Sequence, residues 1–206
     1  CQYVDNEAMK GLDACLAGNR YERDEAESTV YVADFKDLSG KFFGQTELAG
    51  SGAGQGADEG KAAVLGAGVK AVPLSAVTAR MWNQFLKKLE SLPNEDGTVP
   101  DLNVKYLYDQ AASFLLVKRG EPEGCILLEK QDADYILSYF CILSKAAPAE
   151  MMGLFRASYQ VLKKYCDPED KIYINALTET TQKMVLQMTD QKAKTVGQAA
   201  ARYYIY

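Results

Sequence analysis

Apolar residues follow a helical repeat over most of the chain after residue 72. In each stretch they return every three to four positions, which is the spacing of one helix face. The stretches cover residues 81–92, 104–115, 126–146, a segment that begins at Pro148 and one that begins near Ile172. Short loops separate them, which is typical of antiparallel neighbours. The pattern therefore predicts an all-α fold, an up-down helical bundle of four to five helices over residues 73–206.

Residues 1–72 have a different pattern. A short helix is predicted from residue 5 to 16, and the β-branched and aromatic residues 28–35 are typical of a strand. Residues 40–68 contain nine of the chain's 16 glycines and show no apolar periodicity, which indicates a flexible loop. We expect residues 1–72 to form an extended N-terminal arm with a Gly-rich loop at 40–68.

Composition excludes several classes of function. The sequence contains no histidine and has a formal net charge of −5. Without histidine there is no Ser-His-Asp or Cys-His catalysis and no His-containing zinc site. The negative charge disfavours nucleic acid as a partner, because phosphate binding needs a basic surface. No run approaches the roughly 20 apolar residues that cross a bilayer, so a membrane-peripheral protein is expected rather than a transmembrane one.

Two motifs carry possible chemistry and have simpler explanations. Residues 64–71, with Gly66 and Gly68, resemble the start of a dinucleotide-binding fingerprint, but Pro73 interrupts the helix that this fingerprint requires. A loop explains them better. Two acidic clusters offer carboxylates for a cation or for acid–base work: residues 22–25 with Glu27, and Glu129 with Asp132 and Asp134. Solvated helix ends explain these clusters, so we predict neither a metal site nor catalytic residues; the cofactor-binding residues are unknown.

The five cysteines form no metal-binding pattern, and their odd number leaves at least one thiol unpaired. Cys125 and Cys166 bracket the predicted hairpin of the third and fourth helices. At ~1.5 Å per residue, their distances from its turn place them at the same end of the bundle. A disulfide between them is one prediction, which requires an oxidising compartment; two unrelated thiols are the alternative.

The two ends of the sequence also bear on partners. The chain begins with Cys1, which fits either a lipidated cysteine of a bacterial lipoprotein or a chain whose targeting segment was removed. Tyr203, Tyr204 and Tyr206 close the chain together with Ile205. Such an apolar ending is expected to dock on the bundle or on a neighbouring protein.

Residues 136–183 resemble part of a known family. The resemblance rests on Ile136-Leu137, Ala146-Ala147-Pro148, residues 154–159, residues 168–171 and residues 177–183. They resemble the PsbQ-type extrinsic subunits of photosystem II, and this resemblance implies a four-helix bundle with a long N-terminal arm, bound to the lumenal face of the photosystem. The family's members are not enzymes.

These observations predict a non-catalytic structural or assembly subunit of a large complex, associated with a photosystem or antenna at the chloroplast thylakoid. No intrinsic cofactor is expected; pigment contacts would come through neighbouring subunits. Protein partners would bind the N-terminal arm and the aromatic C-terminus. The alternative is a periplasmic or surface lipoprotein, a helical bundle that binds a small ligand or lipid. An enzyme using carboxylates or a thiol is the third hypothesis.

Overall fold

The fold is mixed α/β, so the prediction of an all-α bundle is wrong. The computed structural model describes residues 2–5, 10–18, 21–38, 43, 62–91, 102, 105–143, 148–176 and 179–204. Nine strands and four α-helices lie within these ranges. In chain order they are β1 (Gln2–Asp5), α1 (Lys10–Gly18), β2 (Tyr21–Asp34), β3 (Ala63–Gly66), β4 (Val69–Pro73), α3 (Ala79–Glu90), β5 (Phe114–Lys118), β6 (Glu121–Gln131), β7 (Asp134–Ile142), α4 (Pro148–Tyr165), β8 (Lys171–Ala176), α5 (Glu179–Met188) and β9 (Lys194–Tyr204).

The chain divides into two compact units. Unit 1 contains residues 1–42 and 168–206, and unit 2 contains residues 43–167. Residues 1–72, expected to form a single arm, contribute strands to both units: β1 and β2 to unit 1, and β3 to unit 2. Because the first and last segments of the chain build unit 1 together, the polypeptide leaves that unit, forms unit 2 and returns.

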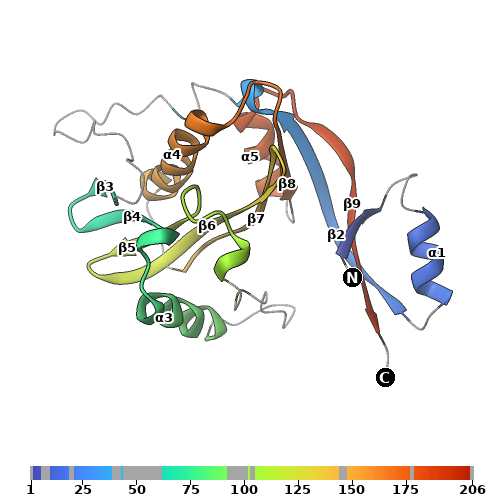
Figure 1. The fold of residues 1–206 in the computed structure, drawn as a ribbon, viewed down its shortest axis with the longest axis horizontal. Coiled ribbons are helices and arrows are strands. Elements are labelled where there is room, and N and C mark those ends of the chain that lie inside the picture. Colours follow the sequence, from blue (N-terminus) through green and yellow to red (C-terminus); the bar gives the residue numbers. More distant parts are fainter. Residues whose placement is uncertain are drawn as a thin grey trace. The chain divides into compact units, whose positions relative to one another are not determined.

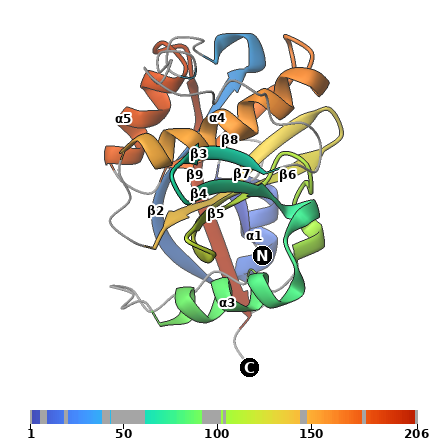
Figure 2. The same cartoon turned by 90° about the vertical axis from the view of Figure 1, so that its left-hand side faces the viewer.

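Unit 2 is a row of antiparallel strands with a helix on each face. The strands lie in the order β7-β6-β5-β4-β3. Helix α3 packs on β6, while α4 contacts β3, β4, β5 and β6. Figures 1 and 2 show α3 and α4 on opposite sides of these strands. The strands are therefore covered on both faces, which explains their nearly continuous apolar sequence.

The main core of unit 2 lies on the α3 side. Trp82, Phe85 and Leu89 of α3 pack there against alternate residues of β5 and β6. The members of this core are Leu74, Val77, Trp82, Phe85, Leu89, Leu102, Tyr108, Leu115, Val117, Cys125 and Leu127. Side chains alternate across a strand, so the intervening residues Leu116 and Ile126, also buried, belong to the other face.

Unit 1 is built around β2. This strand pairs antiparallel with β8 on one side and with β9 on the other, and β1 extends the row beyond β9. Helix α5 packs on β8 and α1 on β2. The central position of β2 shows that the N-terminal segment is a structural element of the unit, and the prediction of a strand at residues 28–35 is confirmed in part by β2.

Two hairpins replace the predicted second and third helices. Strands β5 and β6 are joined at Arg119 and Gly120, whose φ angles are 53° and 88°. Strands β6 and β7 turn at Asp132, with a φ of 56°. Positive φ at the first or at both residues of such a two-residue turn matches the right-handed twist of paired strands. The apolar runs on either side are short, and periodicity does not distinguish a buried strand from a buried helix over such lengths.

Two of the predicted helices are confirmed. Helix α3 begins after Thr78, whose hydroxyl accepts a hydrogen bond from the backbone N–H of Met81 at 3.2 Å. Helix α4 begins at Pro148 and ends at Tyr165, before Pro168. The fifth predicted helix is correct only for residues 179–188, because residues 171–176 and 194–204 are strands.

Substitution of Gly124 tests how closely β6 and β7 approach each other. A Cβ at this position would lie 2.6 Å from the carbonyl oxygen of Cys141 and 3.2 Å from the Cα of Ile142. Backbone atoms cannot move aside, so Gly124→Ala should lower the free energy of unfolding by about 2 kcal/mol. Gly66→Ala is the matched control, since nothing lies within 4 Å of its Cβ. Urea unfolding of both variants measures the difference, and equal stabilities would contradict this close approach.

Candidate functional site

Strand β7 contains a bulge at Ser138. Leu127 of β6 lies opposite Tyr139, whereas the next residue, Leu128, lies opposite Leu137. Ser138 is therefore one extra residue on β7 with no partner on β6. A bulge of this kind locally disrupts the ladder and reorients the side chains around it, and bulges are common beside active sites.

The bulge also changes which face each residue of β7 occupies. Cross-strand partners point to the same face, so Tyr139 and Cys141 share the α3 face with Leu127 and Cys125. This agrees with their packing against the α3-side core. The neighbouring Phe140 lies on the other face, where its ring centroid is 4.6 Å from that of Phe155 on α4.

Ser138 carries a buried hydroxyl without a hydrogen-bond partner. Its Oγ makes no such bond to the residues that the structure describes, and Trp82 Nε1 is the only other buried side-chain atom of this kind among them. Leaving a buried polar group unpaired costs about 1–3 kcal/mol. Folded proteins satisfy most buried hydroxyl groups, so an exception next to a bulge is a candidate ligand-binding group.

Two thiols and a phenol lie beside the bulge on the α3 face. The Sγ atoms of Cys125 and Cys141 are 3.8 Å apart. Burial raises the pKa of the Cys125 thiol well above its ordinary value. Hydrogen bonds from Cys125 and from Tyr139 lower the pKa of Cys141. Burial raises the pKa of Tyr139, so its phenol stays protonated at neutral pH and acts as a hydrogen-bond donor.

Helix α4 is the next described element after β7. It begins at Pro148, and Glu150 in its first turn accepts a hydrogen bond from Lys118 Nζ of β5 at 2.9 Å. A carboxylate is stabilised at this end of a helix, where the backbone N–H groups point outward. Ser158 anchors the middle of α4, since its Oγ donates to the carbonyl oxygen of Ala112 at 2.7 Å. Both contacts hold α4 against the strands of unit 2.

The carboxylates singled out from the sequence belong to turns and strand ends. Glu129 lies in β6, Asp132 in the turn after it, and Asp134 at the start of β7, so the expectation of a helix end is wrong. The side chains of residues 22–27 lie outside the described residues. Across the part of the chain that the structure describes, no three Cys, Asp or Glu side chains converge as a metal-binding group.

Residues 64–71 fall in a β-hairpin. Ala63–Gly66 pairs antiparallel with Val69–Pro73, and Gly68 supplies the turn with a φ of 73°. The segment is thus not the loop that was expected, and β3 is followed by a strand where a dinucleotide fingerprint would need a helix.

The geometric basis for pairing Cys125 with Cys166 is absent. Cys125 lies in β6, directly opposite Cys141, and Cys166 follows the last turn of α4. The helical hairpin that would bring Cys125 and Cys166 together does not exist, and their pairing stays a prediction. At the C-terminus, Tyr203 and Tyr204 belong to β9, but their side chains, like residues 205–206, lie outside the described residues.

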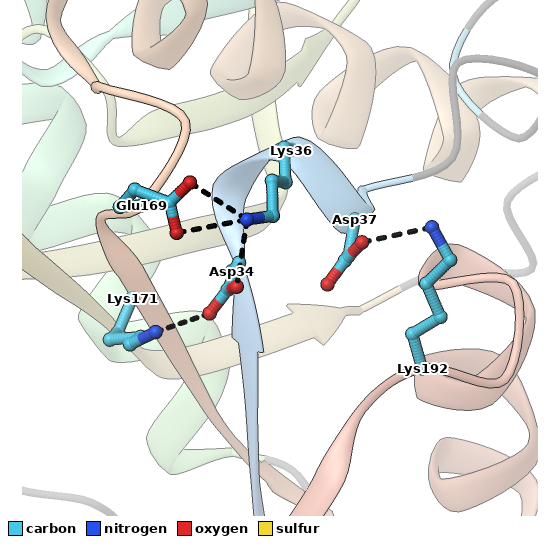
Figure 3. A network of polar contacts seen from close by, with 6 residues as sticks. All are labelled: Asp34, Lys36, Asp37, Glu169, Lys171 and Lys192. Atoms are coloured by element: carbon cyan, nitrogen blue, oxygen red, sulfur yellow. Dashed lines mark hydrogen bonds and ion pairs between the residues drawn. The ribbon is translucent and has the colours of Figure 1, made fainter.

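A cluster of charged side chains lies where β2 ends in unit 1 (Figure 3). Lys36 Nζ is 2.7 Å from a carboxylate oxygen of Glu169 and 3.5 Å from one of Asp34. Asp34 also accepts a hydrogen bond from Lys171 on β8. Lys192 Nζ is 2.9 Å from a carboxylate oxygen of Asp37. Each carboxylate in this cluster is paired with a lysine.

Beside this cluster, backbone hydrogen bonds join the end of β2 to the segment that precedes β8. The N–H of Phe35 donates to the carbonyl oxygen of Asp170 at 2.8 Å, and that of Lys36 to Pro168 at 3.1 Å. The charged pairs therefore add side-chain contacts to the backbone hydrogen bonds that join β2 to β8. Because every lysine has a carboxylate and most of these side chains are partly exposed, we assign the cluster to the stability of unit 1 and not to ligand binding.

Replacement of Asp34 tests this assignment through pH. The hydrogen bond from Lys171 lowers the pKa of Asp34 below its ordinary value. A lowered pKa in the folded state stabilises the protein above the unfolded pKa of about 4, and the gain is lost as pH falls through the folded pKa. Asp34→Asn should therefore lower the urea midpoint at neutral pH, with the difference shrinking as pH falls through the folded pKa of Asp34. Asp190→Asn, an exposed position after α5, is the control; a pH-independent difference would contradict the assignment.

Comparison of the sequence with protein-family models and with curated proteins gave no match. Solved structures of similar fold were found. A functionally unknown conserved protein from Staphylococcus epidermidis has a TM-score of 0.52 and 12% identity, over 98% of this chain and 69% of that chain. A GCN5-related N-acetyltransferase from Sphaerobacter thermophilus has a TM-score of 0.51 and 10% identity, over 98% of this chain and 57% of that one.

The C-terminal domain of a putative lysylphosphatidylglycerol synthetase from Agrobacterium fabrum is similar to the same extent. Its TM-score is 0.51 at 11% identity, with 97% of this chain and 66% of that chain covered. The fold resembles that of GCN5-related N-acetyltransferases. At such identities the likeness concerns the fold alone, and the chain spans between 57% and 69% of the length of these three structures.

This fold overturns the photosystem interpretation. The residues that carried the PsbQ-type resemblance form strands β7 and β8 as well as α4 and α5, not a helical bundle. The predictions of a non-catalytic structural subunit and of a photosynthetic setting depended on that bundle, and both are wrong; the similar folds include named acetyltransferases. In the described residues no helix combines the length and the apolarity needed to cross a bilayer. The expected protein partners and pigment contacts stay predictions.

Sequence reasoning missed Ser138 and Tyr139. A signal for them was present, because Ser138 is the single polar residue in the run from Ile136 to Leu143, apart from the tyrosine and cysteine. A serine in an apolar run of a strand marks either a solvated face or a buried hydroxyl that needs a partner. The helical interpretation gave it neither role.

Proposed function

We propose that this chain is an acyltransferase that moves an acyl group from an activated donor to an amine or hydroxyl acceptor. The observation that carries the proposal is the unpaired buried hydroxyl of Ser138 at the bulge of β7. Two structures of similar fold support it by their names, one an N-acetyltransferase and one a domain of a putative lysylphosphatidylglycerol synthetase. Both names describe transfer of an acyl group to a nucleophile.

The chemistry of acyl transfer explains the features of the bulge. When a nucleophile attacks a carbonyl carbon, negative charge develops on the carbonyl oxygen, and a preorganised hydrogen-bond donor stabilises it. Ser138 Oγ–H has no competing acceptor among the described residues. A donor without a partner in the free protein stabilises the new charge without first giving up another hydrogen bond, and the low-dielectric surroundings of a buried oxygen strengthen the effect.

The rest of the site holds this donor in place. The contact between Phe140 and Phe155 fixes β7 to α4 directly beside the bulge. On the other face, Tyr139 packs against the α3-side core. Both contacts restrict the movement of β7 next to Ser138, which is the preorganisation that charge stabilisation requires.

Ser138→Ala is the test of the proposal. The variant should lose about 10- to 100-fold in kcat for transfer of an acetyl group from acetyl-coenzyme A to a primary amine, with KM nearly unchanged. Its unfolding free energy should stay equal or rise by about 1 kcal/mol, because an unsatisfied buried hydroxyl is removed. Transfer is measured by release of the free thiol and by the mass of the acylated amine, over a panel of amines and alcohols.

Ser75→Ala provides the matched control, since Ser75 is exposed in a short 3-10 helix of unit 2 and its backbone N–H, which bonds to Gln110, is retained. A purely structural Ser138 would give the reverse result, a less stable variant with unchanged kcat. Absence of acyl transfer to every amine and alcohol tested, from a folded chain that melts cooperatively, would contradict the proposed function itself.

A further inference from the structure

The pair Cys125 and Cys141 has a geometry that core packing does not require. These cysteines are direct partners in the antiparallel register of β6 and β7. Their Sγ atoms face each other at 3.8 Å. Opposite residues of antiparallel strands have Cα atoms about 4.5–5.5 Å apart, within the range that a disulfide spans. Only a small movement of the two side chains separates the dithiol from a bonded pair.

Gly124 allows the two strands to lie close together beside this pair. It precedes Cys125, and the space of its missing Cβ is taken by backbone atoms of Cys141 and Ile142. The two strands therefore approach each other more closely here than a side chain at position 124 would permit. Bonded cysteines have Cβ atoms about 3.5–4.5 Å apart, at or below the usual cross-strand separation of about 4.5–5.5 Å, so a close approach favours the bond.

The two thiols differ in access and in acidity, which gives them different roles. Cys125 is 0% exposed, whereas Cys141 is partly exposed. Hydrogen bonds from Cys125 and Tyr139 lower the pKa of Cys141, while burial raises that of Cys125. The thiolate is the attacking species in thiol–disulfide exchange. Cys141 is thus the thiol that meets an external disulfide first, and Cys125 is the one that resolves the product.

We propose that Cys125 and Cys141 form a modification site at which a low-molecular-weight disulfide converts the dithiol to a reversible cross-strand disulfide. The Cys141 thiolate attacks one sulfur of the small disulfide, forms a mixed disulfide and releases one small thiolate. Cys125 then attacks Cys141 Sγ, and its proton passes to the second small thiolate, which leaves as a thiol. In total, two protein thiols are oxidised by two electrons and one small disulfide is reduced to two thiols.

The product would fasten β6 to β7 next to the bulge. It would also take away the thiol that accepts the hydrogen bond of Tyr139. The modification does not depend on acyl transfer, because it is read from the protein's own sulfur atoms and needs neither an acyl donor nor an acceptor.

Peptide mapping of the full chain tests the proposal. The folded protein is incubated with oxidised glutathione, alkylated, and digested with trypsin without reduction. Cleavage after Lys130 separates the two cysteines into the peptides 120–130 and 131–145, and Cys166 falls in a third, 165–171. We expect peptides 120–130 and 131–145 to appear joined, with a mass two hydrogens below their sum. Dithiothreitol should separate them again, and the oxidised protein should melt at a higher temperature.

Two single variants test the order of the steps. Cys125→Ser should stop at the mixed disulfide and retain one glutathionyl group on peptide 131–145. Cys141→Ser should not react at position 125 in the folded state, because that thiol is buried. Thermal melts establish that both variants are folded, and Cys125→Ala replaces the serine variant if it is not.

Three results would overturn the proposal. The first is that both thiols of the folded wild-type chain resist oxidised glutathione and become alkylated only on unfolding, as buried structural cysteines do. The second is a link between peptides 120–130 and 165–171, which would restore the pairing of Cys125 with Cys166. The third is a stable glutathionyl group on Cys141 of the wild-type chain, because a resolving thiol 3.8 Å away would remove it.

Discussion

The extra residue in β7 determines the arrangement of unit 2. If Ser138 paired with Leu127 instead of forming the bulge, the residues that follow it would alternate in the opposite phase: Phe140 would turn toward α3, and Tyr139 and Cys141 toward α4. The bulge shifts the phase by one, so that Phe140 meets Phe155 on one face while Tyr139 and Cys141 join the core of Trp82 and Phe85 on the other. One residue thus fixes which aromatic ring covers each face, and it places both the unpaired hydroxyl and the thiol pair within a few positions of each other.

The same short region concentrates features that a strand chosen only for stability would avoid. It has a buried hydroxyl without a partner in the part of the chain that the structure describes, two facing thiols, and a glycine in the interior of the neighbouring strand. Each is less stable than an apolar alternative, because unsatisfied groups and strand glycines are both unfavourable. Proteins tolerate costs of this kind where they bind a ligand or catalyse a reaction. Their occurrence around residues 124–141 therefore indicates that the candidate functional site lies in this part of the sheet and not at the charged cluster of unit 1.

Sequence periodicity is informative here only where one face of an element is solvated. Helix α3 has Lys87 and Glu90 on its exposed face, and its boundaries could be predicted to within a few residues. Strands β5 to β7 are covered on both faces, so their apolar runs lack alternation and imitate a buried helix. The turn residues indicate these hairpins better than the periodicity does, since Arg119, Gly120 and Asp132 all adopt positive φ angles. The site itself could not be predicted, because a bulge depends on the register with β6, which is a long-range property.

Strand β2 has a consequence for how the chain acquires its structure during synthesis. It pairs with β8, whose residues come about 140 positions later in the chain, and with β9, which comes later still. Residues 43–167 leave the ribosome as a complete unit, and each strand from β3 to β6 pairs with the next strand in the chain, which allows them to fold at once. Strand β2 has by then been synthesised, but neither of its partners has emerged, because β8 lies at residues 171–176 and β9 at residues 194–204. During that interval it presents two unpaired edges, and an early stop in translation would leave both open to other strands.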